Sequence, residues 1–314
     1  MSFTQELKNY ILSARNMDLV GIARADALKK EPEFHTPGEI LPGAKSVVVF
    51  GRRLPDGAVQ QQMRKLEDGN VVAQSGYAAY GSDLAPNFLL LFDTFNIAQF
   101  IERTFGYTAV PLPCGPMQNG VPVSTPMPQF AGPYKAGLPM DIDKAAMAAG
   151  LGEFGWSNRF LTPEYGPRVQ FGAIITQMEL DYDEPYNGPK LCDPEKCGIC
   201  SKLCPTCALP ACGECEPDVK EIEGKAVEVS PLKPNSCIVA ACALRKEFAG
   251  RIPTKDLVDN YDPTDEELIQ AFKEKPIASL SLDHYPKYFC DKCLIYCPVG
   301  GWEKRFRETG LTRE

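Results

Sequence analysis

Residues 290–298 read Cys-Asp-Lys-Cys-Leu-Ile-Tyr-Cys-Pro, and residues 197–205 read Cys-Gly-Ile-Cys-Ser-Lys-Leu-Cys-Pro. Both runs have the spacing C-x2-C-x3-C-P. This spacing is the tail of the bacterial ferredoxin run, in which the cysteine before the proline ligates the other of two clusters. Two copies in one chain therefore predict two 4Fe–4S clusters that exchange their last ligands.

The ligand sets follow from the need of each cluster for four thiolates. Cys192 precedes the first run by a looser C-x4-C spacing, and Cys237 is the best candidate for the remaining position. We assign one cluster to Cys192, Cys197, Cys200 and Cys297, and the other to Cys204, Cys237, Cys290 and Cys293. Structural zinc also uses four thiolates, but two proline-terminated runs argue against it.

Five cysteines lie outside these two sets: Cys114, Cys207, Cys212, Cys215 and Cys242. Cys207, Cys212 and Cys215 repeat the spacing of Cys192, Cys197 and Cys200. A third metal site built from these three and Cys242 is one interpretation. The other is that they are free thiols that pack as small apolar groups.

The distribution of cysteine divides the chain of 314 residues, because twelve of the 13 cysteines lie beyond position 191. We expect an α/β cofactor domain over residues 1–185 and a ferredoxin-like domain over residues 186–314, joined near residues 182–189. The first residues lack a charged segment followed by an apolar one, so we expect a cytoplasmic protein with reduced thiols. No apolar run reaches the roughly 18 residues of a membrane span. The net charge of −8 argues against a nucleic-acid partner, since such partners usually meet a basic face.

Local patterns predict a mixed set of helices and strands in the first half. A first helix, capped by Ser2 or Thr4, is expected to run to about Arg15. Apolar, β-branched runs predict strands at residues 18–23, 46–50 and 171–176. Helices are expected at residues 84–105, 143–149 and 264–274, and a Pro/Gly-rich loop at 111–139.

Residues 150–155 read Gly-Leu-Gly-Glu-Phe-Gly, which fits the pattern G-x-G-x-x-G. A dinucleotide site needs a strand before this pattern and a helix after it. The preceding residues 143–149 are predicted to be helical, which disfavours such a site.

The same glycine segment carries a family resemblance. Residues 148–155 (Ala-Ala-Gly-Leu-Gly-Glu-Phe-Gly) and 161–169 (Leu-Thr-Pro-Glu-Tyr-Gly-Pro-Arg-Val) resemble the signature of the corrinoid-dependent reductive dehalogenases, and the region is similar to epoxyqueuosine reductase. Cys237 and residues 290–298 also resemble both families, so the likeness runs from about Asp18 to Gly300. It implies an α/β (α+β) fold: a nitroreductase-like domain that binds cobalamin base-off, followed by a ferredoxin-like two-cluster domain.

The resemblance implies a cytoplasmic reductase in which two clusters pass electrons to cobalamin and then to a small-molecule substrate. The corrinoid would supply the difficult chemistry and the protein the binding and the proton donors. A reduced ferredoxin or a flavodoxin-type protein is the expected electron donor. A non-catalytic electron carrier without corrinoid is the main alternative, and a flavin enzyme on the same scaffold is another.

Two departures from these families favour the carrier alternative. Trp156 stands where an Arg or Lys is often found, with Arg159 three residues later. Ala136 stands near the position of an acidic proton donor of epoxyqueuosine reductase, while Asp141 and Asp143 are close to it but out of register. Together with the net charge, the second departure argues against tRNA as the substrate.

Site residues follow from this implied chemistry. The proton-donor candidates are Tyr134, Lys135, Arg159, Tyr165 and Arg168, of which Tyr134, Arg159 and Tyr165 are the predicted catalytic set. The predicted cofactor-binding residues are Gly150, Gly152, Gly155, Tyr80 and Arg168, because glycine permits close backbone approach to a bulky ring. Tyr165 and Arg168 have the alternative of shaping their turn, and Tyr77 and Tyr80 that of lining the pocket or packing in the core.

Overall fold

The computed structural model describes residues 2–31, 34–68, 77–82, 84–112, 140–241, 262–274 and 290–301. It has a mixed α/β fold built on a four-stranded antiparallel sheet with the order β1-β2-β6-β3. The strands are β1 (Leu19–Arg24), β2 (Ser46–Arg53), β6 (Val169–Thr176) and β3 (Ala109–Pro111). The three strands predicted from the sequence are therefore confirmed.

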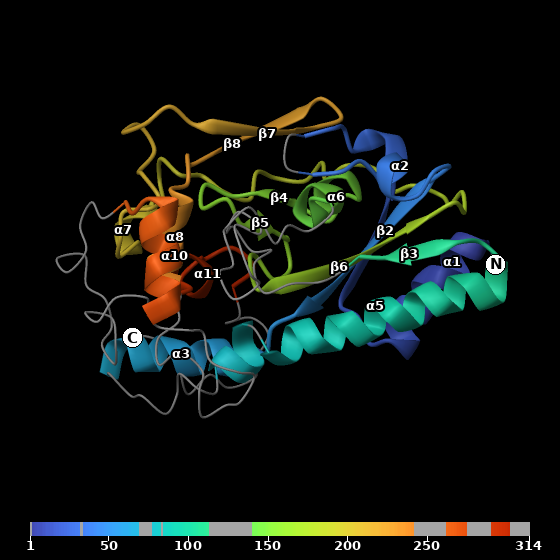
Figure 1. The fold of residues 1–314 in the computed structure, drawn as a ribbon, viewed down its shortest axis with the longest axis horizontal. Helices are drawn as coiled ribbons and strands as arrows, with labels where there is room; N and C mark the ends of the chain where they lie inside the picture. Colours follow the sequence, from blue (N-terminus) through green and yellow to red (C-terminus); the bar gives the residue numbers. More distant parts are fainter. Residues whose placement is uncertain are drawn as a thin grey trace.

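Helices cover both faces of this sheet, which explains why its central strands are apolar along their length (Figure 1). On one face, α6 (Ile142–Ala148) packs on Val47, Val49 and Ile175. On the other face, α1 (Phe3–Asn9) and α5 (Leu84–Phe105) pack on Val48 and Ile174. Strands that are buried on two faces read as continuous rather than alternating apolar runs.

The helix boundaries follow local capping signals. Ser2 accepts a hydrogen bond from the backbone N–H of Gln5 and caps α1, which continues as a π-helical turn, η1 (Tyr10–Ala14). Helix α5 ends before Gly106 and α6 before Gly150, and both glycines have positive φ, as helix C-termini favour. Helix α3 (Asp56–Asp68), which the sequence analysis did not predict, precedes the short η3 (Tyr77–Ser82).

The second half begins with an extended segment that leads to the hairpin of β7 (Asp218–Ile222) and β8 (Lys225–Val229). Glu223 and Gly224 both have positive φ, which suits a two-residue hairpin turn. Ile222 and Val229 lie in the same apolar cluster as α6 and the sheet. The core therefore includes residues on both sides of the predicted domain boundary, and the division at residue 185 stays a prediction.

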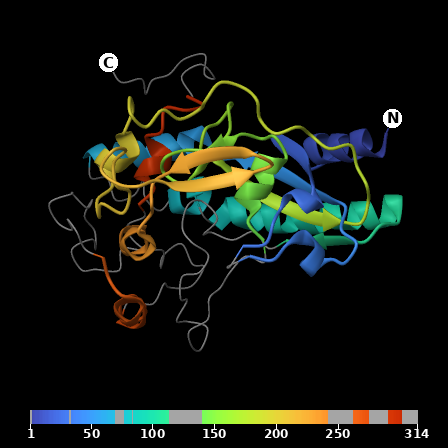
Figure 2. The ribbon, with the colours of Figure 1, turned by 90° about the horizontal axis from the view of Figure 1, so that it is seen from above.

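The remaining helices gather at the end of the molecule that lies opposite α1 (Figures 1 and 2). They are α7 (Ile199–Leu203), α8 (Pro234–Ala241), α10 (Asp265–Glu274) and α11 (Lys292–Ile295). Thr264 and Glu267 form a capping box at the start of α10, which confirms the helix predicted there. The short elements α2 (Pro37–Ile40), η2 (Ala25–Ala27), β4 (Glu153–Phe154) and β5 (Phe160–Leu161) complete the described fold.

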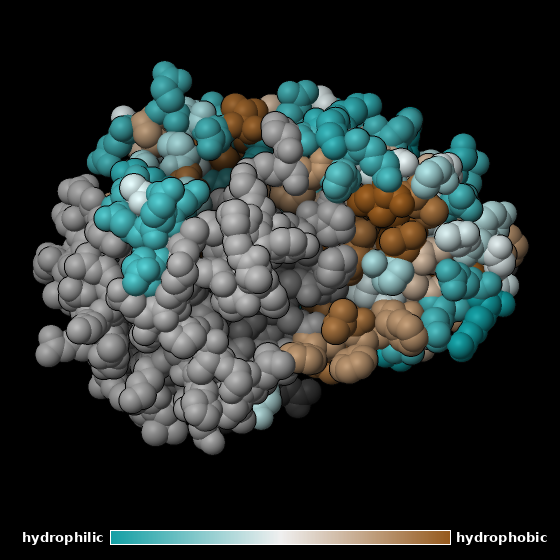
Figure 3. Space-filling view, viewed as in Figure 1, coloured by the Kyte–Doolittle hydropathy of each residue, from teal (hydrophilic) through white to brown (hydrophobic). Residues whose placement is uncertain are grey.

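The described surface is mostly hydrophilic around the hairpin β7–β8 and more apolar over α5 (Figure 3). The exposed apolar side chains of α5 are Phe88, Leu89, Leu91, Phe92 and Phe95. Within the described part of the chain, no helix combines the length and the apolar character that crossing a membrane requires.

Candidate functional site

The two cysteine runs lie side by side although they are far apart in the sequence. Helix α7 carries Cys200 of the first run, α11 carries Cys293 of the second, and these two helices pack against each other. Cys204 is buried, and the partly buried Cys200, Cys237 and Cys293 pack around it. Short helices thus bring cysteines from three separate segments to one place.

One group of four cysteines is defined by mutual electrostatic influence. Burial raises the pKa of Cys237 well above its ordinary value, and the neighbouring Cys293, Cys204 and Cys290 raise it further. Burial likewise raises the pKa of Cys290 to about 12, with Cys204 and Cys293 acting in the same direction. We refer to Cys204, Cys237, Cys290 and Cys293 as the Cys290 group.

The other four predicted ligands form a second group around Cys297. Burial raises the pKa of Cys297 to about 11, and Cys192 and Cys197 act in the same direction. Burial also raises the pKa of Cys200 to about 12, followed by the influence of Cys293 and then of Cys192. We refer to Cys192, Cys197, Cys200 and Cys297 as the Cys297 group. Cys200 therefore lies between the two groups.

The two groups follow the sets that the spacing predicts, but Cys200 also packs with Cys204, Cys237 and Cys293. The assignment of ligands to each cluster therefore stays a prediction. Several sulfurs already have donors: the backbone N–H of Trp156 lies 3.4 Å from Cys192 Sγ, and Arg159 Nε lies 3.0 Å from Cys293 Sγ. Buried thiolates with N–H donors fit the anionic sulfur shell of an iron–sulfur cluster. Across the described residues, no three or more His, Cys, Asp or Glu side chains are arranged to hold a metal ion. The four thiolates of a 4Fe–4S cluster bind separate irons, so they need not converge on one point.

Arg159, predicted to be catalytic, lies against the Cys290 group. It is 6% exposed, and its Nη2 lies 2.6 Å from Asp291 Oδ1. The hydroxyl of Tyr77 donates to the other carboxylate oxygen of Asp291 at 2.9 Å. The sequence analysis missed Asp291, although its position between two predicted ligands was a usable signal. The catalytic role of Arg159 stays a prediction.

Arg168, predicted to bind the cofactor, holds the loop after the second cysteine run. It is 1% exposed. Nη1 donates to the carbonyls of Leu294 and Cys297, and Nη2 donates to those of Val299 and Gly300. This geometry favours the alternative in which Arg168 shapes its surroundings, and no contact here supports cofactor binding by it. Tyr165, in the same turn, is partly buried and packs against the main core.

The glycine run is explained by the packing of the chain on itself. A Cβ on Gly150 would lie 2.2 Å from the carbonyl oxygen of Glu184, and one on Gly152 would lie 1.9 Å from that of Leu161. A Cβ on Gly155 would meet the side chain of Leu161 at 2.6 Å. The close approach that glycine permits is therefore to the backbone and side chains of this protein, and the cofactor-binding role of the run stays a prediction. Helix α6 precedes the run, as predicted, where a dinucleotide site would need a strand.

The other predicted residues are not brought to this site by the described structure. Tyr80 is 58% exposed on η3. Tyr134, Lys135, Ala136, Cys114 and Cys242 lie outside the described residues. Among the extra cysteines, Cys212 and Cys215 are close enough for Cys212 to raise the pKa of Cys215, after the effect of burial.

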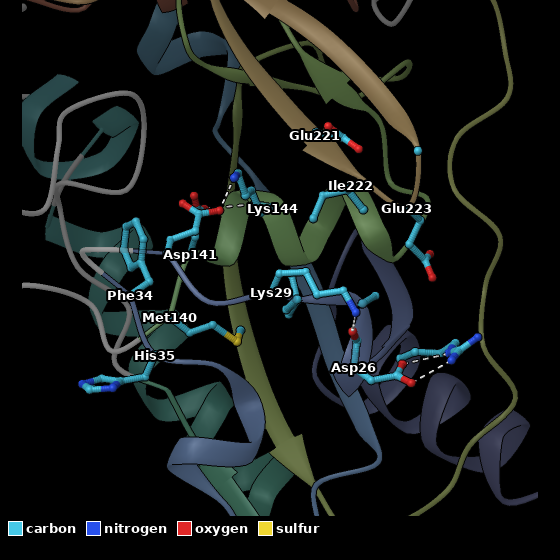
Figure 4. Close-up of a pocket in the computed structure, with 15 residues that line it drawn as sticks. Asp26, Lys29, Phe34, His35, Met140, Asp141, Lys144, Glu221, Ile222 and Glu223 are labelled. Atoms are coloured by element: carbon cyan, nitrogen blue, oxygen red, sulfur yellow. Dashed lines mark hydrogen bonds and ion pairs between the residues drawn. The ribbon is translucent and has the colours of Figure 1, made fainter.

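A separate pocket of about 570 Å³ lies between η2, the start of α6 and the β7–β8 turn (Figure 4). Its charged groups pair with one another: Lys144 with Glu31, and Arg24 with Asp26, whose carbonyl also accepts from Lys29. The residues that line it include no cysteine. This pocket is therefore separate from the two cysteine groups.

Comparisons with known proteins point to two related groups of enzymes. No family model matches the chain. A tetrachloroethene reductive dehalogenase of Desulfitobacterium hafniense is 31% identical over 136 residues, which are 43% of this chain and 20% of that protein. An epoxyqueuosine reductase of Gloeobacter violaceus is 28% identical over 193 residues, 60% of this chain and 56% of that protein. The chain is similar to both groups. The resemblance predicted from the sequence is confirmed.

Solved structures support the same fold. The epoxyqueuosine reductase of Bacillus subtilis has a TM-score of 0.52 at 18% identity, and the match covers 99% of this chain and 68% of that one. An epoxyqueuosine reductase bound to a modified tRNA stem loop has a TM-score of 0.51 at 17% identity, covering 98% of this chain and 68% of the other. At these identities the likeness shows the fold alone.

Proposed function

We propose that this protein is a corrinoid- and iron–sulfur-dependent reductase that resembles reductive dehalogenases. In this proposal two 4Fe–4S clusters pass electrons from a reduced ferredoxin or flavodoxin-type protein to cobalamin and then to a small-molecule substrate. The observation that carries this proposal is that eight cysteines gather in the Cys290 and Cys297 groups of a chain built on a four-stranded sheet. The sequence likeness to enzymes named as reductases supports the same chemistry.

The contribution of the protein to the cluster sites is to hold and shield sulfur. Helices α7, α8 and α11 fix Cys200, Cys237 and Cys293. The four hydrogen bonds of Arg168 hold the loop that follows Cys297. Backbone and guanidinium N–H groups offset the negative charge on Cys192 and Cys293. Two buried groups that meet at Cys200 suit electron transfer from one cluster to the other.

The corrinoid would supply reduction at cobalt, and the chain would bind it and deliver protons. A buried carboxylate oxygen is available for such a partner: Asp143 Oδ1 has no hydrogen-bond partner in the described part of the chain, and Asp143 is 6% exposed. Burial raises the pKa of Asp143 well above its ordinary value, which favours the protonated form of the carboxyl. Tyr134 and Tyr165 remain proposed proton donors. Tyr80, Gly150, Gly152 and Gly155 remain proposed cofactor-binding residues.

Anaerobic purification followed by cofactor analysis tests the proposal. We expect about eight iron atoms per chain, and one corrinoid in the acid extract after reconstitution with cobalamin. Zinc in place of iron would contradict the clusters. A flavin in the extract, or no cobalamin bound under reducing conditions, would contradict the corrinoid. Turnover assays should include halogenated small molecules and an epoxyqueuosine-modified tRNA stem loop, since turnover of the RNA alone would contradict a small-molecule substrate.

A non-catalytic electron carrier is the second candidate, and Trp156 favours it. Its indole is 2% exposed and donates through Nε1 to the carbonyl of Pro210 at 2.9 Å, so this position contributes packing rather than the basic group often found in the families. A carrier would show reversible cluster reduction, no bound corrinoid and a stable protein partner in pull-down experiments.

A further inference from the structure

Arg159 makes a direct side-chain contact to a predicted cluster sulfur. Its Nε donates to Cys293 Sγ at 3.0 Å, and its Nη2 donates to Asp291 Oδ1 at 2.6 Å. Both partners of this ion pair are buried, with 7% of each side chain exposed. The guanidinium therefore sits between a sulfur and a carboxylate, away from solvent.

The position of Arg159 is fixed by local structure on both sides. It closes the turn between β4 and β5, where its carbonyl accepts from Gly155 N–H and where Asn158 has positive φ. Asp291 in turn is held by the hydroxyl of Tyr77 on η3 and begins α11. A contact with this support is pre-organised rather than a chance orientation of a long side chain.

The guanidinium of Arg159 places a positive charge directly against the Cys290 group. An arginine side chain stays protonated in proteins, and the ion pair with Asp291 holds this charge in place. The hydrogen bond from Nε brings the charge to Cys293 Sγ at 3.0 Å.

The Cys297 group has a different environment. Arg168 also carries a positive charge near Cys297, but its Nη1 and Nη2 donate to backbone carbonyls rather than to sulfur. Cys192 Sγ accepts a hydrogen bond from the neutral backbone N–H of Trp156, at 3.4 Å. The potential of a cluster rises with positive charge and with hydrogen bonds to its sulfurs, because both stabilise the added electron.

We propose that Arg159 is a positioning residue that raises the reduction potential of the cluster held by the Cys290 group, through its hydrogen bond to Cys293. This inference rests on the proposed function, because it requires the two clusters. A higher potential makes this cluster the acceptor of the single electron that leaves the cluster of the Cys297 group. Asp291 limits the increase and holds the guanidinium in place.

The test is a redox titration, followed by electron paramagnetic resonance, of the full chain with both clusters reconstituted anaerobically. In Arg159→Gln the potential of one cluster should fall by at least a tenfold change in its reduction equilibrium, about 59 mV for one electron. Arg159→Lys keeps the charge and should restore most of the potential. Asp291→Asn removes a negative charge next to the guanidinium and should shift the same cluster in the opposite direction.

Arg52→Gln is the matched control, because Arg52 forms a similar ion pair with Asp93 at 2.7 Å that includes no cysteine. It should leave both potentials unchanged. Unchanged potentials in Arg159→Gln with full iron content would overturn the inference and leave the proposed function intact. Shifts of the same sign in Arg159→Gln and Asp291→Asn would also overturn it, since they indicate general disruption. A wild-type chain without clusters would overturn both proposals.

Discussion

Arg168 Nη1 lies 2.8 Å from the carbonyl oxygen of Cys297. This bond ties the turn at residues 162–168 to the loop after the second cysteine run. The contact is tight on the backbone side as well, because a Cβ on Gly166 would lie 2.0 Å from the carbonyl oxygen of Val299. The turn at residues 162–168, which carries part of the family resemblance, thus holds the loop after the second cysteine run in place.

Replacement of Arg168 by methionine should destabilise the protein. The change leaves buried carbonyls without a donor, and each such group costs about 1–3 kcal/mol. We expect a loss of about 3 kcal/mol or more in the free energy of unfolding, measured by denaturant titration of the holoprotein. Arg24→Met is the control, because Arg24 pairs with Asp26 at the surface, with 53% and 70% of the two side chains exposed, where the loss of an ion pair should cost little stability. Equal losses of stability in the two variants would contradict the role of Arg168 in holding the loop after the second cysteine run.

Replacement of Cys290 by serine should remove one cluster and spare the other. Burial and then the neighbouring Cys204 and Cys293 raise the pKa of Cys290, which places Cys290 beside these two cysteines. Iron content should fall from about eight to about four atoms per chain. Cys215→Ser is the matched control, since Cys215 lies next to Cys212 instead, and it should retain all the iron. Loss of iron in Cys215→Ser would point to the third metal site.

Replacement of Gly152 by alanine should be severely destabilising. Its φ of +155° and the approach of its Cα to Leu161 leave no room for a methyl group. We expect a loss of at least about 3 kcal/mol in the free energy of unfolding, in the range of strained buried sites. Gly57→Ala is the control: Gly57 lies in α3 with no atom near the added methyl, and it should gain about 0.5–1 kcal/mol. A stable Gly152→Ala protein that fails to bind cobalamin would instead support the predicted cofactor role.

Asp143 should make stability depend on pH. Burial and the nearby Asp141 raise its pKa in the folded protein, so the folded chain keeps a proton that the unfolded chain releases. Stability from this group is therefore lost as the pH rises above the unfolded pKa, by about 1.4 kcal/mol per pH unit up to the folded pKa.

Asp143→Asn removes that loss, and its stability relative to the wild type should increase as the pH rises above about 4, the ordinary pKa of an aspartate. Unfolding titrations across this range measure the difference. Asp26→Asn is the control, because a hydrogen bond from Arg24 lowers the pKa of Asp26, and its replacement cannot produce a gain that grows with pH. A constant difference between Asp143→Asn and the wild type would show that the carboxyl is ionised when buried.

Local patterns predicted the elements that are built from local signals. The run at residues 46–50 forms part of β2, and the helix expected at 84–105 has the observed bounds of α5. The hairpin β7–β8 was missed, although the alternation at residues 225–229 and the Glu-Gly turn before it were usable signals. Local patterns thus predicted three of the four strands of the main sheet, whereas the pattern of the separate β7–β8 hairpin was not used.

The contacts of the two buried arginines could not be read from local patterns. Arg159 contacts Asp291 and Cys293, which lie 132 and 134 residues further along the chain. The spacing within a motif does not indicate such a distant partner. The cysteine groups differ, because the ferredoxin spacing already encodes an exchange of ligands between runs. The cysteine sets were therefore predictable from a known ligand pattern, whereas the contacts of the buried arginines could be seen only in the structure.

The interleaving of the two cysteine groups also constrains how the protein can be made. Each group contains a cysteine at or before residue 204 and another at or after residue 290. In the proposed assignment, a nascent chain that has emerged only to residue 289 can complete neither set of ligands. Cluster insertion would then have to follow translation of the second run, and premature termination would yield chains without either cluster.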